Sequence, residues 1–393
     1  MAPREPEPIV SEELIRQLQR RTAAVGDDVK KLRLVRHSVA RHEAAAQQRA
    51  RLFRESREIR RQRVRLAFAI PFTALFLAFS LTPRGKHASP RPAAARVRPI
   101  VEVAGPGVWL VERKGGLEIY SNGLRVDNEY LTSTRPRSYV GFNRQNWRPS
   151  GYQTQPAGIV FHTTESRMAP FEPSQNDRLQ YNGRSLLGFI ARKHLYHFLI
   201  DRFGRVFRVV AETDYANHAG RSIWADEHSI YWSLNQSFLG VAFEAQTEST
   251  DIATPAQIDA ARVLTEMLRS RYHIPAMNCV THAQVSVNLQ TMRLGYHTDW
   301  AANFPFRAVG LGDGYSTPVA ALTLFGFDYD TTFLQANGGR VWPGLVMAEE
   351  QIVREAAAYG TTFDLYRRQL RHRFHAWKPD SGAASAEDAS GDR

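Results

Sequence analysis

Two histidines of this 393-residue chain stand where metal ligands are often found, at the ends of short apolar segments. His162 follows the run GIVF at residues 158–161, and His282 follows NCVT at residues 278–281. A histidine at the carboxyl end of a buried strand points into the cleft at that edge of a sheet. Two such residues can supply neutral imidazoles to one zinc ion.

Histidines are concentrated in this part of the chain: eight of the 13 lie between His162 and His297. A catalytic zinc site has three protein ligands and leaves a fourth position for water. Asp299, in the run GYHTDW at residues 295–300, is the predicted third ligand, with His297 as its rival. Because distant ligands have no fixed spacing, this pattern alone is a weak indication of a metal site.

Charge and cysteine content exclude several other classes of protein. The formal net charge is +12, but residues 1–65 hold 17 Lys and Arg against nine Asp and Glu, whereas residues 151–330 hold 14 against 17. The basic character therefore belongs to the N-terminal arm, and we expect no nucleic-acid partner. The only cysteine, Cys279, excludes a disulfide framework and any site that needs several thiolates.

An uncharged run at residues 66–81 (LAFAIPFTALFLAFSL) indicates a single membrane span. Sixteen residues fall short of the roughly 20 that cross a bilayer comfortably, but flanking residues extend the run. A buried core helix and a cleaved signal peptide are the alternatives, and a signal-anchor at 66–82 is the prediction. The 17 residues before the run carry eight Lys and Arg and the 17 after it five, which places the N-terminus in the cytoplasm and the rest outside.

The rest of the chain divides by composition and periodicity. An Asn-Gly pair at 122–123 between two short β segments predicts a hairpin, and helices are predicted at 256–272, 349–359 and 363–377. Strands and helices mix through the histidine-rich part, which predicts an α/β (mixed) fold with a central mixed sheet flanked by helices. The expected parts are a basic helical cytoplasmic arm (1–65), the anchor helix (66–82), a linker (83–100), a hairpin-containing segment (101–150), the zinc domain (151–308), a helical extension (309–378) and a disordered tail (379–393).

Six short motifs in this region stand in the order of one known family. They are GIVFHTTES with His162, HLYHFLIDRFGRVFRVV with Tyr196, ANHAG with His218, FLGVAFEAQ, VTHAQVS with His282, and YHTDW with Asp299. Together they resemble the zinc-dependent N-acetylmuramoyl-L-alanine amidases, a family that includes phage lysis amidases and the peptidoglycan recognition proteins. The resemblance covers roughly residues 157–306. It implies the amidase/peptidoglycan-recognition fold, one Zn²⁺, and His162, His282 and Asp299 as its ligands.

Two departures from the family pattern concern the catalytic groups. One branch of the family has a glutamate two residues after the glycine of the central strand, where this chain has Ala242; Glu244 lies two residues further, on the same face if the strand continues. Another branch uses the tyrosine that corresponds to Tyr196, which is present. The family lysine two residues before the last ligand is His297 here. The resemblance therefore implies Tyr196, Glu244 and His297 as catalytic residues.

The activity that the resemblance implies is zinc-assisted hydrolysis of the amide bond between N-acetylmuramic acid and L-alanine in peptidoglycan. With the anchor, it implies a single-pass protein of the bacterial inner membrane whose catalytic domain faces the periplasm. A peptidoglycan-binding module that does not cut, and a structural protein that scaffolds other cell-wall enzymes, are the alternatives. The presence of all three predicted ligands favours the enzyme, whereas Ala242 and His297 leave the binding module as an alternative.

Overall fold

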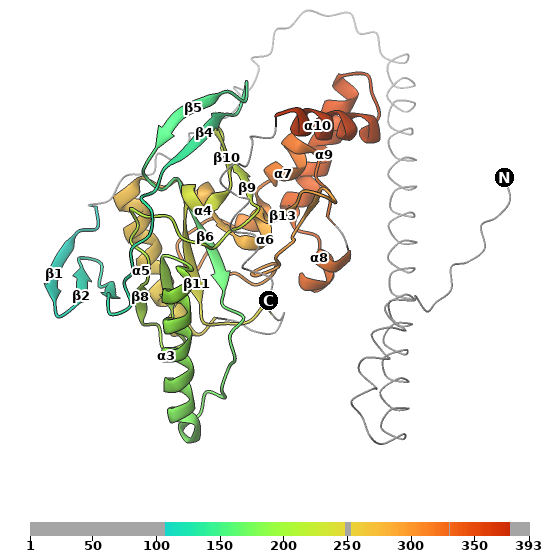
Figure 1. Cartoon of the computed structure of the whole chain (residues 1–393). Helices are drawn as coiled ribbons and strands as arrows, with labels where there is room; N and C mark the ends of the chain where they lie inside the picture. The colour runs from blue at the N-terminus through green and yellow to red at the C-terminus, as the bar shows by residue number, and fades with distance from the viewer. Residues whose placement is uncertain (1–106, 248–252, 330, 378–393) are drawn as a thin grey trace, which may run out of the picture. The chain divides into compact units, whose positions relative to one another are not determined.

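The computed structural model (Figure 1) describes residues 107–247, 253–329 and 331–377, all within the compact unit Glu102–Arg393. The predicted arm, membrane anchor, linker and C-terminal tail lie outside these residues. Among the helices that the structure describes, none combines the length and the apolar character needed to cross a bilayer. The anchor therefore stays a prediction from the sequence.

A mixed sheet of eight strands forms the frame of the fold and confirms the predicted α/β class. Its spatial order is β1 (Leu110–Lys114), β2 (Leu117–Tyr120), β3 (Arg125–Asp127), β8 (Val206–Arg208), β7 (Phe198–Ile200), β11 (Phe238–Phe243), β6 (Gly158–Thr163) and β12 (Cys279–Thr281). Strands β7, β11, β6 and β12 run parallel to one another. Every residue of β6 and β11 is buried, as expected for parallel strands covered on both faces.

Helices cover the two faces of this sheet. On one face, α5 (Pro255–Tyr272) packs Leu264 and Met267 against Phe161 and Phe243. On the other face, α3 (Asn176–Lys193) packs against β7 and β11. The sequence explains where α5 begins, because Thr254 and Gln257 form a capping box. The prediction of this helix at 256–272 is confirmed.

A second layer packs against β6, β11 and β12. It contains the antiparallel sheet β5 (Pro149–Gln153), β4 (Tyr139–Asn143), β10 (Ser229–Trp232) and β9 (Ile223–Ala225), and the two-stranded sheet β13 (Val287–Asn288) and β14 (Arg293–Leu294). Its helices are α4 (Leu234–Ser237), α6 (His282–Val285), α7 (Ala320–Phe325), α8 (Thr331–Ala336), α9 (Pro343–Ala358) and α10 (Phe363–Trp377), with short 3-10 turns at Pro173–Gln175, Ala276–Asn278 and Gly314–Ser316. The helix predicted at 363–377 is confirmed, and the one predicted at 349–359 begins earlier, at Pro343.

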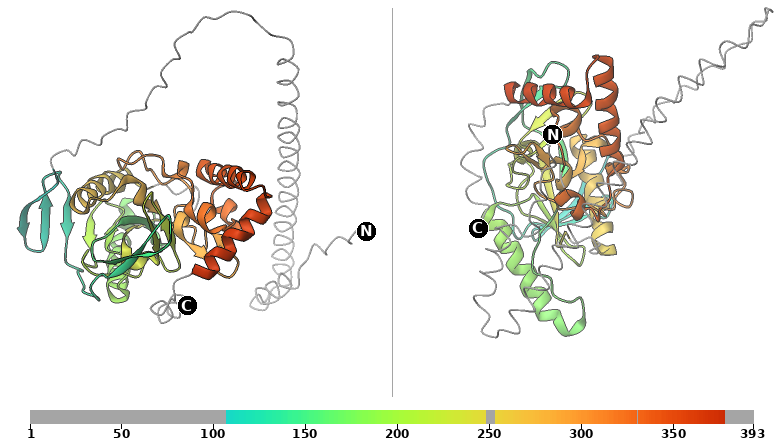
Figure 2. Two further views of the ribbon diagram at one scale, coloured as in Figure 1. Left: turned by 90° about the horizontal axis from the view of Figure 1, so that it is seen from above. Right: turned by 90° about the vertical axis from the view of Figure 1, so that its right-hand side faces the viewer.

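The C-terminal helices pack on the second layer as part of one apolar core. Phe325 of α7, Ile352 of α9 and Phe374 of α10 are fully buried in a cluster that also contains Ile223 and Ile230 of β9 and β10. Figures 1 and 2 show these helices and the first strands on opposite sides of the central strands. The central strands are therefore flanked by β1, β2 and β3 on one side and by α7, α9 and α10 on the other.

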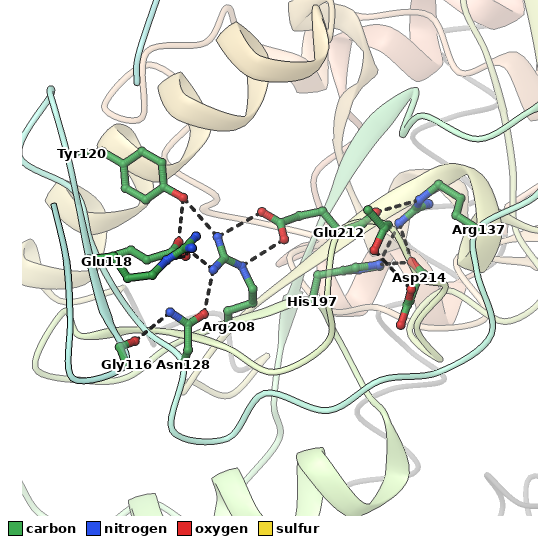
Figure 3. A network of polar contacts seen from close by, with 11 residues as sticks. Gly116, Glu118, Tyr120, Asn128, Arg137, His197, Arg208, Glu212 and Asp214 are labelled. Atoms are coloured by element: carbon green, nitrogen blue, oxygen red, sulfur yellow. Dashed lines mark hydrogen bonds and ion pairs between the residues drawn. The ribbon is translucent and has the colours of Figure 1, made fainter. Parts of the chain in front are cut away.

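A buried ion-pair network attaches the predicted hairpin to the main sheet (Figure 3). Strands β2 and β3 pair antiparallel around Gly123, which has a positive φ of 85°, as the Asn-Gly signal predicts. The guanidinium of Arg208, on β8, donates to Glu118 (2.7 Å) and Asn128 (2.6 Å), and to Glu212 (3.2 Å). Burial by itself would raise the pKa of Glu118, but the hydrogen bond and charge of Arg208 outweigh it and lower the pKa to about 2.

This network predicts how stability depends on pH. Because folding lowers the pKa of Glu118 from 4.5 to about 2, its stabilising contribution is complete above pH 4.5 and is lost as the pH falls toward 2. We expect Glu118→Gln to reduce the free energy of unfolding at neutral pH by roughly 3 kcal/mol. The difference in the free energy of unfolding between Glu118→Gln and the wild type should become smaller as the pH falls from 4.5 to 2. Urea unfolding over this pH range measures both effects.

The matched control is Glu112→Gln, the same chemical change at an exposed position of neighbouring β1. It should change stability by less than about 0.5 kcal/mol. An equal loss of stability for Glu118→Gln at pH 7 and pH 2 would contradict the role assigned to this ion pair.

Candidate metal centre

Two adjacent parallel strands bring the predicted histidines to one edge of the main sheet. His162 is the penultimate residue of β6, and His282 follows β12 as the first residue of α6. The strands pair in parallel, with Thr281 opposite Phe161, so their carboxyl ends meet at the same edge. This is the edge of an α/β sheet at which ligands commonly bind. The predicted placement of both histidines at strand ends is confirmed.

Asp299 joins these two side chains from the segment that follows β14. Its Oδ2 lies 3.0 Å from His162 Nδ1, and its Oδ1 lies 2.8 Å from His282 Nδ1. The ligand atoms of the three residues all lie within 4.8 Å of one another. The sequence left His297 as a rival third ligand, and the structure brings Asp299 into this group.

The donor set fits a zinc ion. Zinc binds nitrogen and oxygen at about 2.0–2.2 Å in tetrahedral sites, so two ligand atoms of one ion lie roughly 3.3 Å apart. Asp299 Oδ2 lies 3.0 Å from Nδ1 of both His162 and His282, which is close to this value. The three side chains are also shielded from water, with 1% of His162, 7% of His282 and 11% of Asp299 exposed.

The electrostatics of the cluster favour the protonation states that bind a metal. Burial, and next the charge of His282, lower the pKa of His162 to about 4, so its imidazole is neutral at pH 7. Burial alone would raise the pKa of Asp299, but the two histidines together hold it well below its usual value. Asp299 is therefore ionised, and a carboxylate with a neutral imidazole is a combination that zinc takes as ligands.

Tyr196 and His297 lie beside the cluster without joining it. The Tyr196 ring centroid lies 5.0 Å from that of His162, and its φ of 53° is an uncommon backbone conformation for tyrosine. Burial, and next the charge of Asp299, raise the pKa of Tyr196, so its hydroxyl keeps its proton at neutral pH. The exposed His297 ring stacks on His282, with centroids 4.9 Å apart. Both side chains can therefore reach a molecule held at the three ligands.

Glu244 has a different environment from the one that strand alternation predicts. Strand β11 ends at Phe243, one residue before it, and Glu244 Oε2 accepts a hydrogen bond from the backbone amide of Arg202 (3.2 Å). Ala242 pairs with His162 across the strands, so the position facing that histidine holds a methyl group. The structure thus gives Glu244 a backbone partner in the β7–β8 turn, and its catalytic role stays a prediction.

Other residues singled out in the sequence have structural partners. His197 is fully buried and accepts a hydrogen bond from the amide of Gly240 (2.9 Å). Cys279 is buried in β12. Trp300 is buried in the main core, where its indole donates to the carbonyl of His162 (2.9 Å). Sequence reasoning did not find this contact, because it joins residues 138 positions apart.

His218 contacts one of the candidate ligands. Its Nδ1 lies 3.1 Å from His162 Nε2. The motif ANHAG placed it correctly in the family order, but no spacing in the sequence relates it to His162.

Comparisons with known proteins agree with this site. Residues 152–299 match the family model described as N-acetylmuramoyl-L-alanine amidase, which confirms the resemblance predicted from the motifs. The match covers less than half of the chain and contains all three candidate ligands. A comparison with curated proteins gave no match.

Several solved structures are similar to part of the chain. The N-acetylmuramoyl-L-alanine amidase LysC from Clostridium intestinale URNW is 20% identical over 46% of this chain and 93% of its own, with a TM-score of 0.26. AmiD from E. coli, solved with anhydro-N-acetylmuramic acid-L-Ala-D-gamma-Glu-L-Lys, is 20% identical over 61% of this chain and 98% of its own, with a TM-score of 0.34. The Drosophila peptidoglycan recognition protein SD is 18% identical over 40% and 84%, with a TM-score of 0.26.

The site predicts the metal content of three variants. We expect the full chain to bind one zinc ion, and His162→Ala and His282→Ala each to lose it, because two remaining ligands rarely hold zinc. His228→Ala, at an exposed histidine in the β9–β10 turn, is the matched control and should keep the ion. Elemental analysis of the purified proteins measures this. Stoichiometric zinc in either of the first two variants would show that the ligand was misassigned.

Proposed function

We propose that His162, His282 and Asp299 hold one zinc ion and that this chain hydrolyses the amide bond between N-acetylmuramic acid and L-alanine in peptidoglycan. One observation carries the proposal: three ligand atoms from distant segments converge at the carboxyl edge of the main sheet, within the stretch that matches the amidase family. The family match supports peptidoglycan amidase activity. The donor set supports the zinc-dependent route.

The ligands set the charge of the site. When bound, zinc supplies Lewis-acid chemistry: it polarises the carbonyl of the scissile amide and lowers the pKa of water toward about 7. His162 contributes a neutral imidazole and Asp299 one negative charge. Only 1% of the His162 side chain, 7% of His282 and 11% of Asp299 is exposed, so all three are largely shielded from bulk water.

Tyr196 and His297 supply the hydrogen bonds that amide hydrolysis requires. Negative charge develops on the carbonyl oxygen as the carbon becomes tetrahedral, and donors aimed at that oxygen stabilise the transition state. The Tyr196 hydroxyl keeps its proton, and no described residue hydrogen-bonds to it, so it is available to the substrate. His297 stacks on His282 at the exposed side of the site, where a ring N–H can donate a second hydrogen bond.

The direct test is mass spectrometry of peptidoglycan incubated with the full chain. We expect intact glycan strands whose N-acetylmuramic acid residues carry free lactyl carboxylates, and released stem peptides that begin with L-alanine. A chelator should abolish the cleavage and added zinc should restore it. Products cut elsewhere in the peptide or in the glycan would contradict the assigned bond.

Tyr196→Phe should lower turnover about 10²–10³-fold, because it removes one hydrogen-bond donor to the developing oxyanion. Its zinc content should not change, since the phenol is not a ligand. Tyr181→Phe is the matched control, because it removes a hydroxyl from an exposed position on α3.

The turnover of Glu244→Gln should stay within about threefold of the wild type, since the amide oxygen of glutamine can still accept the hydrogen bond from the backbone amide of Arg202. A large loss of turnover in Glu244→Gln, with the zinc content unchanged, would show that Glu244 transfers a proton in the reaction.

One observation favours a second function, a peptidoglycan-binding module that does not cut. The position on β11 opposite His162 is Ala242, so no carboxylate of this strand faces the ligands. Binding of muropeptides by the zinc-loaded full chain without any released peptide would favour this alternative over the enzyme.

The location of the protein is proposed from the sequence alone. Residues 66–82 would form the single span in the inner membrane and residues after 83 would face the periplasm, where peptidoglycan lies. A reporter that is active only in the periplasm, fused after residue 377, should be active. Activity of a cytoplasm-dependent reporter at the same position would reverse this orientation.

A further inference from the structure

The ring of His218 hydrogen-bonds on both sides. Its Nδ1 lies 3.1 Å from Nε2 of His162, and its Nε2 lies 3.3 Å from the backbone carbonyl oxygen of Phe238. A carbonyl oxygen only accepts hydrogen bonds, so the proton of the neutral His218 ring must be on Nε2. His218 Nδ1 is then an acceptor.

This chain of hydrogen bonds determines the tautomer of His162. If His218 Nδ1 accepts, His162 Nε2 must carry the proton and donate it. The other nitrogen of His162, Nδ1, then has a free lone pair, and it is this nitrogen that lies 3.0 Å from Asp299. The second ring nitrogen of a metal-bound histidine usually donates in this way, which fixes both the tautomer and the orientation of the ring.

The next residue of the same turn acts on the other histidine. Nε2 of His282 lies 3.4 Å from the carbonyl oxygen of Ala219, which again only accepts. The proton of His282 is therefore on Nε2, and its Nδ1 is free toward Asp299, 2.8 Å away. Two successive residues thus direct the Nδ1 atoms of both histidines to the same point.

The protein holds this turn rigidly. Oδ1 of the buried Asn235, on α4, accepts from the backbone amides of both His218 (2.9 Å) and Ala219 (2.6 Å). The His218 ring also lies directly against Gly240 of β11, where an added Cβ would come within 2.6 Å of its Cγ. Glycine at this position leaves the room that the His218 ring needs.

We propose that the 218–219 turn is the support of the metal centre, with His218 as the positioning residue of His162 and the Ala219 carbonyl as that of His282. Asn235 holds the turn in place. This inference rests on the proposed zinc site. According to this inference, the 218–219 turn determines that Nδ1, and not Nε2, is the ligand atom of His162 and of His282.

The test compares two amides at position 218 in the full chain. His218→Asn places an amide oxygen where Nδ1 stood, so it keeps the acceptor for His162. His218→Gln places its amide at the Nε2 position, so it keeps the contact with Phe238 and loses that acceptor. Loss of such a support typically weakens metal affinity about 10–100-fold, so we expect this loss for His218→Gln and an affinity within about threefold of the wild type for His218→Asn. Competition with a chromophoric zinc chelator measures the affinity, and His228→Ala is the control.

A second measurement does not depend on activity or on the stability of a variant. Nitrogen-15 NMR of the imidazoles in the zinc-loaded wild type should show Nε2 protonated and Nδ1 bound to metal for His162 and His282. Zinc on Nε2 of either ring, or wild-type affinity in His218→Gln, would overturn the inference. If the wild type itself binds no zinc, the proposed function fails instead, so the two failures are distinguishable.

Discussion

The contact between Asp299 and two buried histidines is the constraint on which the site depends. A carboxylate that is removed from water without a partner costs several kcal/mol, so this segment depends on the partner that Asp299 meets between His162 and His282, which in the proposed site is a zinc ion bound to Nδ1 of both rings. The next residue reinforces the contact, because Trp300 donates to the carbonyl of His162 and packs its ring against Phe243. The segment that carries Asp299 is thereby attached to the strand that carries His162.

The extension that follows the amidase-like region holds the same segment from its other side. The Tyr315 hydroxyl donates to the carbonyl of Trp300 (2.8 Å), and the Trp342 indole donates to the carbonyl of Ala301 (2.8 Å). Both donors come from the part of the chain beyond residue 308, whose role the sequence left open. This part of the chain therefore holds the two residues that follow Asp299, and its helices cover β9 and β10. At the opposite side of the sheet, Arg208 attaches the first three strands in a comparable way (Figure 3).

The central strands carry the geometry of the site because their positions are determined on both sides. β6 lies between β11 and β12, in parallel register with each, and both its faces are covered. Two histidine rings contact Gly240 of β11. The His218 ring packs against its Cα, and Nδ1 of His197 accepts a hydrogen bond from its backbone amide. The buried guanidinium of Arg137 adjoins His197 and donates to carbonyl oxygens of Glu212 and Asp214 (Figure 3). Side chains held in this way lose little further freedom when a metal binds, which favours a preorganised site.

The local features of this protein could be predicted from its sequence. Apolar runs that end in histidine predicted the strand ends at His162 and His282, Asn-Gly predicted the β2–β3 turn, and helical periodicity predicted α10 within its observed bounds. These signals depend on neighbours within a few positions. The position of Asp299 beside His162 and His282, the backbone partner of Glu244 and the contact of His218 with His162 depend on side-chain directions and on contacts between residues 17 to 137 positions apart. Only the packed sheet determines those distances, because no local pattern records which way a side chain turns once its strand is paired.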